Sequence, residues 1–296
     1  MALLTDEQID RFWEQGYLVA PGGATAAQVS AMSAEIDGWI EDSRSQVANY
    51  GDTADGKARF DLEIGHCAQT PRLRRVSNPC DISAAFLEVM RRAAVVDMVS
   101  DLIGPDVKFH HSKLNIKLPG MDTHVGYHQD HPFDPHTNDD VIVTLLMLDD
   151  VSEENGCTYM LPGSHKGDHY SHYRDGDFVG EIAKSQIPDI ETKAVAATGM
   201  AGDVILMHTW MVHGGPPNRS HKPRRLLITD YTAADAYPLT PPKVASPHSG
   251  EVVRGKPSLT ARLKPDVIEM PPNYRDDSFF AVQGQKAATA SQDIEP

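Results

Sequence analysis

Cysteine is scarce in this chain, and its positions do not favour structural bonds. The three cysteines, Cys67, Cys80 and Cys157, lie far apart and include no CxxC pair. We therefore expect neither a disulfide framework nor a cysteine-rich zinc site. Basic residues are also few, because 27 Lys and Arg against 42 Asp and Glu give a net charge of −15. This balance argues against nucleic acid or an anionic membrane as the main partner.

Long apolar segments are missing as well. The longest apolar run, Val141 to Leu148, is too short to cross a bilayer and is expected to belong to the core. The first twenty residues carry five charged side chains where a secretory leader has an apolar stretch. We expect a cytoplasmic protein without a signal peptide. At 296 residues and 40% hydrophobic content, the chain is long enough to bury a substantial core.

Helical patterns precede strand patterns along the chain. Capping-box motifs begin at Thr5 and Thr25, each ahead of apolar residues at helical spacing, and a third helical pattern covers 87–102. Residues 43–80 look polar and irregular. Later runs that are short and β-branched predict strands near 107–118, 141–149, 157–161, 203–213 and 224–232. This order favours an α+β domain in which helices flank a closed or sandwiched antiparallel sheet.

We expect a single catalytic domain over residues 1–296. Its parts are a mostly helical flank (1–104), a strand-rich core (105–232) and a proline-rich wrapping tail (233–296) whose last dozen residues fray.

Histidine is the informative residue type, with fourteen copies. In the stretch Thr123 to Phe133, His128 and Asp130 are two residues apart, so an extended strand turns both side chains to one face. An imidazole and a carboxylate placed in this way can bind one divalent metal. His213 is the candidate third ligand, with His208 as its rival, five residues away.

A turn centred between Asn218 and Arg219 places His213 directly across an antiparallel pair from Arg224. Two histidines and one carboxylate leave three positions open on an octahedral metal, the arrangement of non-heme Fe(II) oxygenases. Two open positions suit 2-oxoglutarate and the third suits O2, while Arg224 can hold the far carboxylate of the cosubstrate. A zinc hydrolase on the same ligand set stays open as an alternative, although it has no use for Arg224.

The chain resembles the phytanoyl-CoA dioxygenase-like family of Fe(II)/2-oxoglutarate-dependent oxygenases up to about residue 232. The motifs that carry the resemblance are Leu4 to Val19, His128-Gln-Asp130, Glu154 to Lys166, and Gly202-Asp203 through His213-Gly214 to Arg224. The resemblance implies a mainly β fold, a double-stranded β-helix (a cupin-like jelly roll) with N-terminal helices packed outside. It also implies that His128, Asp130 and His213 bind iron and that Arg224 binds 2-oxoglutarate.

The resemblance assigns Asn115, and more weakly Thr144, to the cosubstrate pocket. Phe133 and His165, which lies in the 165–178 insertion, are candidate substrate residues because of their position relative to the metal strand. The other histidines (His110, His131, His136, His169 and His172 among them) are expected to be mostly solvated loop residues. The basic cluster Arg72, Arg74 and Arg75 is expected to form a solvated face, with contact to an anionic substrate as the alternative.

The function implied is hydroxylation of an unactivated C–H bond in a small molecule, amino-acid-like or a specialised metabolite, with release of succinate and CO2. Retention of Asp130 favours hydroxylation over halogenation, because related halogenases lack this carboxylate. Desaturation, epimerisation or cyclisation by the same chemistry, and a non-catalytic binding module, are the alternatives. A monomer and a homodimer are equally compatible with the sequence.

Overall fold

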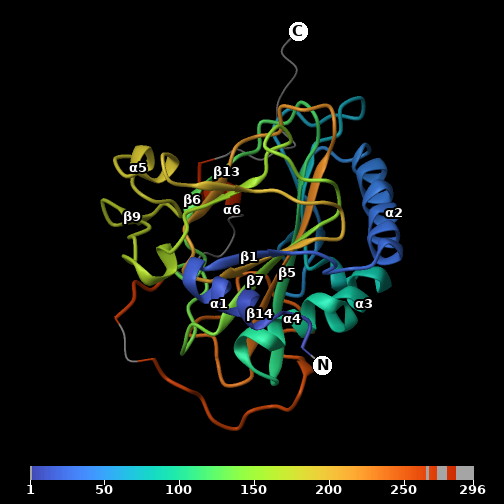
Figure 1. Cartoon of the computed structure of the whole chain (residues 1–296). Coiled ribbons are helices and arrows are strands. Elements are labelled where there is room, and N and C mark those ends of the chain that lie inside the picture. The colour runs from blue at the N-terminus through green and yellow to red at the C-terminus, as the bar shows by residue number, and fades with distance from the viewer. Residues whose placement is uncertain (1, 265–266, 272–278, 285–296) are drawn as a thin grey trace.

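The computed structural model describes residues 2–264, 267–271 and 279–284, and two antiparallel sheets face each other at its centre (Figure 1). The larger sheet has the order β1 (Tyr17–Ala20), β12 (Val204–His208), β7 (Val141–Met147), β14 (Arg224–Ala233), β5 (Val107–Lys117), β4 (Leu73–Ser77), β3 (Ala58–Leu62) and β2 (Tyr50–Asp52), and β15 (Val252–Arg254) also pairs with β5. The smaller sheet has the order β11 (Val195–Ala197), β8 (Thr158–Met160), β13 (His213–Gly215) and β6 (Val125–His128). Two facing antiparallel sheets form the jelly roll expected from the sequence.

Helices cover the outer face of the larger sheet (Figure 1). They are α1 (Asp6–Gln15), α2 (Ala26–Ser43), α3 (Ala84–Arg92) and α4 (Ala94–Ile103). The remaining described elements are the hairpin β9 (Tyr173–Arg174) with β10 (Asp177–Phe178), the helices α5 (Ile187–Glu191) and α6 (Phe279–Val282), and the 3-10 turns at Pro79–Asp81 and Ser164–Lys166. None of the helices in the described ranges is long and apolar enough to cross a membrane.

Both predicted capping boxes are present. The Thr5 hydroxyl accepts the backbone N–H of Gln8, whose side-chain oxygen accepts the N–H of Thr5 in return. Thr25 and Gln28 repeat the arrangement at the start of α2. Each capping box thereby satisfies two backbone N–H groups that lack a partner within the helix, which explains why both helices begin where the sequence predicted.

Three expectations about elements were wrong. The helix predicted over 87–102 is two helices, because Ala93 takes an extended conformation (φ −66°, ψ 157°) between α3 and α4. Residues 43–80 contain β2, β3 and β4, whose alternation was hidden because several of their buried side chains are charged. The strand predicted over 203–213 is divided into β12 and β13, which belong to different sheets. The expected fraying of residues 285–296 lies outside the described residues.

Side chains that alternate along β7 belong to two different hydrophobic cores, one on each face of the larger sheet. Ile142 and Leu146 face the helices, whereas Val143, Leu145 and Met147 face the interior between the sheets. The run from Val141 to Leu148 is buried as expected, and its inner face forms part of the wall of the cavity described next.

Candidate metal centre

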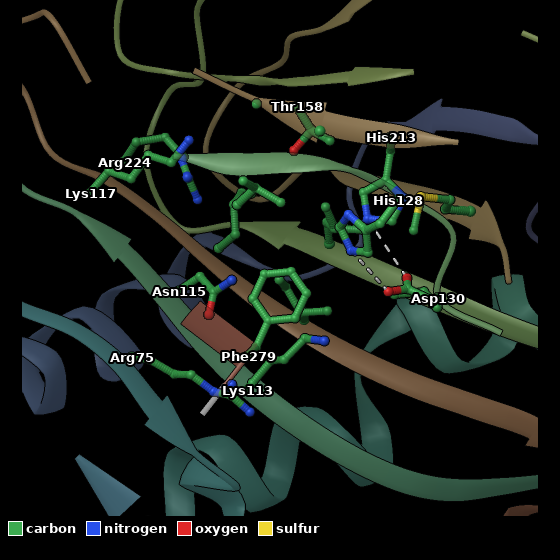
Figure 2. A pocket seen from close by; sticks show the side chains of 18 residues that line it. Arg75, Lys113, Asn115, Lys117, His128, Asp130, Thr158, His213, Arg224 and Phe279 are labelled. Carbon is green, nitrogen blue, oxygen red and sulfur yellow. Dashed lines mark ion pairs between the residues drawn. The ribbon is translucent and has the colours of Figure 1, made fainter. Parts of the chain in front are cut away.

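Three side chains meet between the two sheets at the end of β6. His128 is the last residue of β6, His213 is the first residue of β13, and the two are register partners in the smaller sheet. Asp130 follows β6 and is held by a hydrogen bond from its backbone N–H to the carbonyl of Thr209. The Asp130 carboxylate lies 3.4 Å from His128 Nε2 and 3.8 Å from His213 Nε2 (Figure 2).

The backbone orients both imidazoles. His128 Nδ1 donates to the carbonyl of Gly126 at 2.8 Å, and His213 Nδ1 donates to the carbonyl of Met211 at 3.0 Å. These bonds place the proton on Nδ1 and leave each Nε2 with a lone pair that faces the carboxylate.

The geometry and the charges suit a divalent metal. Two ligands about 2.1 Å from one ion are about 3 Å apart at right angles, close to the separations found here. Burial, followed by the neighbouring His128, lowers the pKa of His213 to about 4, so its imidazole is neutral near pH 7. Burial acts to raise the pKa of Asp130, but the imidazole of His213 and the contact with His128 outweigh it and hold the pKa below its ordinary value. His213 and Asp130 are therefore in the protonation states that metal binding requires.

Arg224 reaches the same cavity from the opposite sheet, which corrects the predicted hairpin. His213 pairs with His128 and Met160 in the smaller sheet, whereas Arg224 pairs with Lys117 in the larger one. The two are not cross-strand partners, because the chain crosses between the sheets through Pro216 and Pro217, and proline cannot donate to a ladder. They nevertheless line one cavity (Figure 2).

Arg224 is a buried cation that forms no ion pair with any residue the structure describes. Its side chain is 3% exposed, and its Nε has no hydrogen-bond partner among the described residues. Burial lowers its pKa only to about 10, so the guanidinium remains charged at neutral pH. Lys117 lies beside it and donates to the carbonyls of Gly156 and Pro216. Burial, followed by the charge of Arg224, moves the pKa of Lys117 well below its usual value.

Of the two residues predicted to bind the cosubstrate, only one lines the cavity. Asn115 lines the cavity, and its amide oxygen has no hydrogen-bond partner in the described chain. Thr144 does not reach the cavity, because its neighbours Val143 and Leu145 occupy the inner face of β7. The Thr144 hydroxyl instead donates to the carbonyl of Thr229.

The two substrate candidates also differ in position. Phe133 packs edge-on against His128, with ring centroids 5.5 Å apart, but it is not one of the residues that line the cavity. His165 does not approach the cavity. Its Nε2 donates to the carbonyl of Trp13, and its ring packs against His208 on the side of the sheet near α1.

Several cavity residues were missed in the sequence. Lys113 and Lys117 flank Asn115 at alternate positions of β5, and all three line the cavity. Because side chains alternate between the two faces of a strand, the position of Asn115 could have indicated both lysines. Arg75 also lines the cavity, so the expectation of a solvated basic face was wrong: Arg74 is 1% exposed and Arg75 is 7% exposed. Phe279, from α6, completes the wall.

The expectation of solvated histidines was also wrong. The following are buried: His110, His131, His136 and His172. His110, His111 and Asp134 form a second group with ligand-like spacing. In this group Asp134 is hydrogen-bonded directly to His110, and Asp230 lies 3.5 Å from His111. These side chains form a buried polar network.

Comparison with known proteins gives consistent matches. The model of the family described as phytanoyl-CoA dioxygenase (PhyH) matches residues 12–226. A probable alpha-ketoglutarate-dependent hypophosphite dioxygenase from Stutzerimonas stutzeri is 32% identical over 289 residues, covering 96% of this chain and 98% of the relative. Methylphosphonate hydroxylase from Gimesia maris is 23% identical over 233 residues, covering 78% and 81%. The crystal structure of EctD from S. alaskensis with bound Fe shares the fold, with a TM-score of 0.65, 22% identity and 89% of each chain covered.

Proposed function

Because the chain belongs to the phytanoyl-CoA dioxygenase (PhyH) family, we propose that it hydroxylates a small molecule at the centre formed by His128, Asp130 and His213. The protein is an oxidoreductase that depends on iron and 2-oxoglutarate and acts on small-molecule substrates, as its relatives do. When bound, iron and 2-oxoglutarate supply oxidative chemistry in which one oxygen atom of O2 enters the product and the other enters succinate, with loss of CO2. The rest of the mechanism concerns what this chain holds, orients and excludes.

The first task is to hold the metal ion at one position. His128 and His213 present Nε2, and Asp130 presents its carboxylate, from neighbouring points of the smaller sheet. The carbonyls of Gly126 and Met211 prevent the imidazole rings from turning. Ligands on one side of the ion leave its other side open toward the cavity, where cosubstrate and substrate have to meet.

The second task is to hold 2-oxoglutarate. The observation that carries the proposal is the buried guanidinium of Arg224, which has no partner in the described part of the chain and lies in the same cavity as the three ligands. A buried charge without a partner is costly, so it indicates a bound anion. The far carboxylate of 2-oxoglutarate matches the planar fork of arginine. The zinc hydrolase alternative leaves this charge unexplained.

The third task is to exclude water around the bond that reacts. Val143, Leu145 and Ile228 give the cavity an apolar wall, with Phe279 contributed from α6. An apolar wall keeps water away from the reacting bond and so limits side reactions of the substrate.

The test is an anaerobic reconstitution followed by turnover. Fe(II) and 2-oxoglutarate together should produce a weak visible absorption band, and admission of O2 should release succinate. With the correct substrate, the product mass should increase by one oxygen atom. A mass lower by two hydrogens would identify desaturation instead. Full activity with zinc and no absorption band would support the hydrolase.

A further inference from the structure

Basic side chains outnumber acidic ones around the cavity. Among its described lining residues, four are basic (Arg75, Lys113, Lys117 and Arg224), and Asp130 supplies the carboxylate. They form two groups: Arg224 lies with Lys117 at one end, and Arg75 lies with Lys113 at another (Figure 2). The proposed function uses the first group and leaves the second without a role.

Arg75 is buried, and no residue in the described ranges makes a hydrogen bond or an ion pair with it. It lies on β4 opposite Asn115 of β5, so both side chains face the interior. None of the described residues makes a hydrogen bond or ion pair with its guanidinium, and its Nε is fully enclosed. The nearest acid in register, Asp61, is bonded to Arg74 instead, at 2.8 Å. Arg75 therefore resembles Arg224: it is a desolvated fork to which no described carboxylate is hydrogen-bonded, although the charge of Asp61 acts on it.

Lys113 extends this positive region toward the metal. It stands on β5 one position along the inner face from Asn115, and its partner in register is Ser77 of β4. Its ammonium lies 5.9 Å from the centre of the Phe279 ring, and no carboxylate lies within ion-pair distance of it in the described chain. The structure thus places a planar fork and a point charge on adjacent strands beside the metal centre.

The charges do not balance when only the cosubstrate is added. Even with Lys117 left out, a divalent metal, Arg224, Arg75 and Lys113 carry five positive charges, whereas Asp130 and the 2-oxoglutarate dianion carry three negative ones. An excess of two positive charges in a largely buried site favours a ligand that brings negative charge. Neither a hydrocarbon nor a zwitterion corrects this imbalance.

We propose that Arg75 and Lys113 form a subsite for the anionic group of the substrate, and that this group is a compact phosphorus oxyanion, a phosphonate or a phosphinate. This inference rests on the proposed function, because it places the substrate beside the metal centre described above. A tetrahedral oxyanion offers oxygens in several directions, so one can accept the two-pronged fork of Arg75 while another meets the ammonium of Lys113. Asn115, the register partner of Arg75 and two residues from Lys113 on β5, lines the same cavity.

The subsite can be measured by binding, independently of turnover. The anaerobic complex of the protein with Fe(II) and 2-oxoglutarate is titrated calorimetrically with methylphosphonate, methanesulfonate and acetate, which share a methyl group and differ in the anion. Hypophosphite is the fourth probe. We expect the phosphorus anions to bind most tightly, and Arg75→Met and Lys113→Met each to weaken them by about 30-fold or more. Arg75→Lys should be intermediate, because it keeps the charge and loses the fork.

Two controls separate this subsite from general effects. Arg92→Gln removes one positive charge from a side chain that is 75% exposed, and it should leave anion binding unchanged. The ligand-free Arg75→Met protein should unfold at the same urea concentration as the wild type or a higher one, because an unpaired buried charge is lost. Marked destabilisation would assign Arg75 a structural role instead.

Other outcomes would overturn the inference. If Arg75→Met or Lys113→Met weakened 2-oxoglutarate as much as an Arg224 variant does, the pair would belong to the cosubstrate. Tighter binding of acetate than of the tetrahedral anions would contradict the phosphorus assignment. Failure of all four anions to bind while the iron–cosubstrate complex forms would reject the subsite alone, whereas failure to form that complex would reject the proposed function.

Discussion

Alternation along single strands separates the cavity residues from their neighbours. Arg224 faces the cavity, while the next residue, Arg225, faces the opposite side and bonds to Asp149 at 2.7 Å. In the same way Val143 lines the cavity while Thr144 does not. A shift of one residue therefore exchanges a functional side chain for a structural one.

Replacement of Arg224 by lysine should weaken 2-oxoglutarate binding by roughly tenfold or more, because the charge remains but the bidentate geometry is lost. Titration of the Fe(II) protein with 2-oxoglutarate, followed by the visible absorption band, measures this. Arg225→Lys is the matched control: it should reduce stability by about 1 kcal/mol through its bonds to Asp149 and leave the affinity unchanged. Equal affinities in the two variants would contradict the role of Arg224.

Substitution Asp130→Ala should abolish iron binding, because it removes the only charged ligand of the proposed set and leaves two neutral imidazoles. Iron content after anaerobic loading and desalting is the measurement. Asp122→Asn serves as the control, since this carboxylate is 78% exposed and pairs with Arg219 on the surface. Full iron content in Asp130→Ala would show that the metal lies elsewhere.

Elements differ in how well local sequence specifies them. The capped helices α1 and α2 begin where Thr5 and Thr25 predict, because their capping bonds span only three residues. The break at Ala93 was not predicted, because alanine favours helix and the break allows α3 and α4 each to pack on the sheet. Residues 204–215 look like one strand, yet they leave one sheet and enter the other.

The cap of α2 provides a test at this scale. Thr25→Ala should lower the free energy of unfolding by about 1 kcal/mol, because the N–H of Gln28 loses its acceptor. Urea denaturation followed by circular dichroism measures the change. Ser30→Ala, an exposed position within the same helix, should stay within a few tenths of a kcal/mol of the wild type or be slightly more stable. Equal losses in both variants would indicate a general effect of alanine in α2.

At the scale of the whole molecule, buried histidines couple stability to pH. Burial is the largest cause that lowers the pKa of His136 and His172 to about 4 and that of His208 to about 3, from 6.5. Between pH 6.5 and about 4 the unfolded chain therefore binds protons on these rings that the folded chain does not bind. Burial raises the pKa of Asp230 to about 7, which acts in the opposite direction.

We therefore expect the free energy of unfolding to fall as the pH decreases below 6.5, by up to about 1.4 kcal/mol per pH unit for each histidine, offset in part by Asp230. Urea midpoints at pH 7, 6 and 5, measured with EDTA so that metal release does not contribute, provide the check. His136→Gln should give a shallower slope, and the exposed His221→Gln should keep that of the wild type. A midpoint independent of pH would contradict burial of the neutral rings.

Patterns in the sequence, together with the family resemblance, were sufficient to predict the capped helices, the strands β5, β7, β8 and β14, and the candidates His128, Asp130, His213 and Arg224. His128 and Asp130 lie within three residues of each other in the sequence, and His213 and Arg224 are indicated by the family resemblance. Contacts between distant segments were therefore not needed to name these four candidates. Which strand pairs with which was not accessible in this way: His213 and Arg224 face one cavity from two sheets, not across one hairpin.

Arg75 shows the remaining limit most clearly. In the sequence it is one of several neighbouring arginines, and surface exposure is the ordinary state of such residues. Packing of β4 against β5 turns its side chain inward beside Asn115, while Asp61 binds Arg74. Whether a charged side chain is solvated or buried depends on contacts between segments far apart in the chain. Those contacts decide the environment of Arg75, and the sequence alone does not.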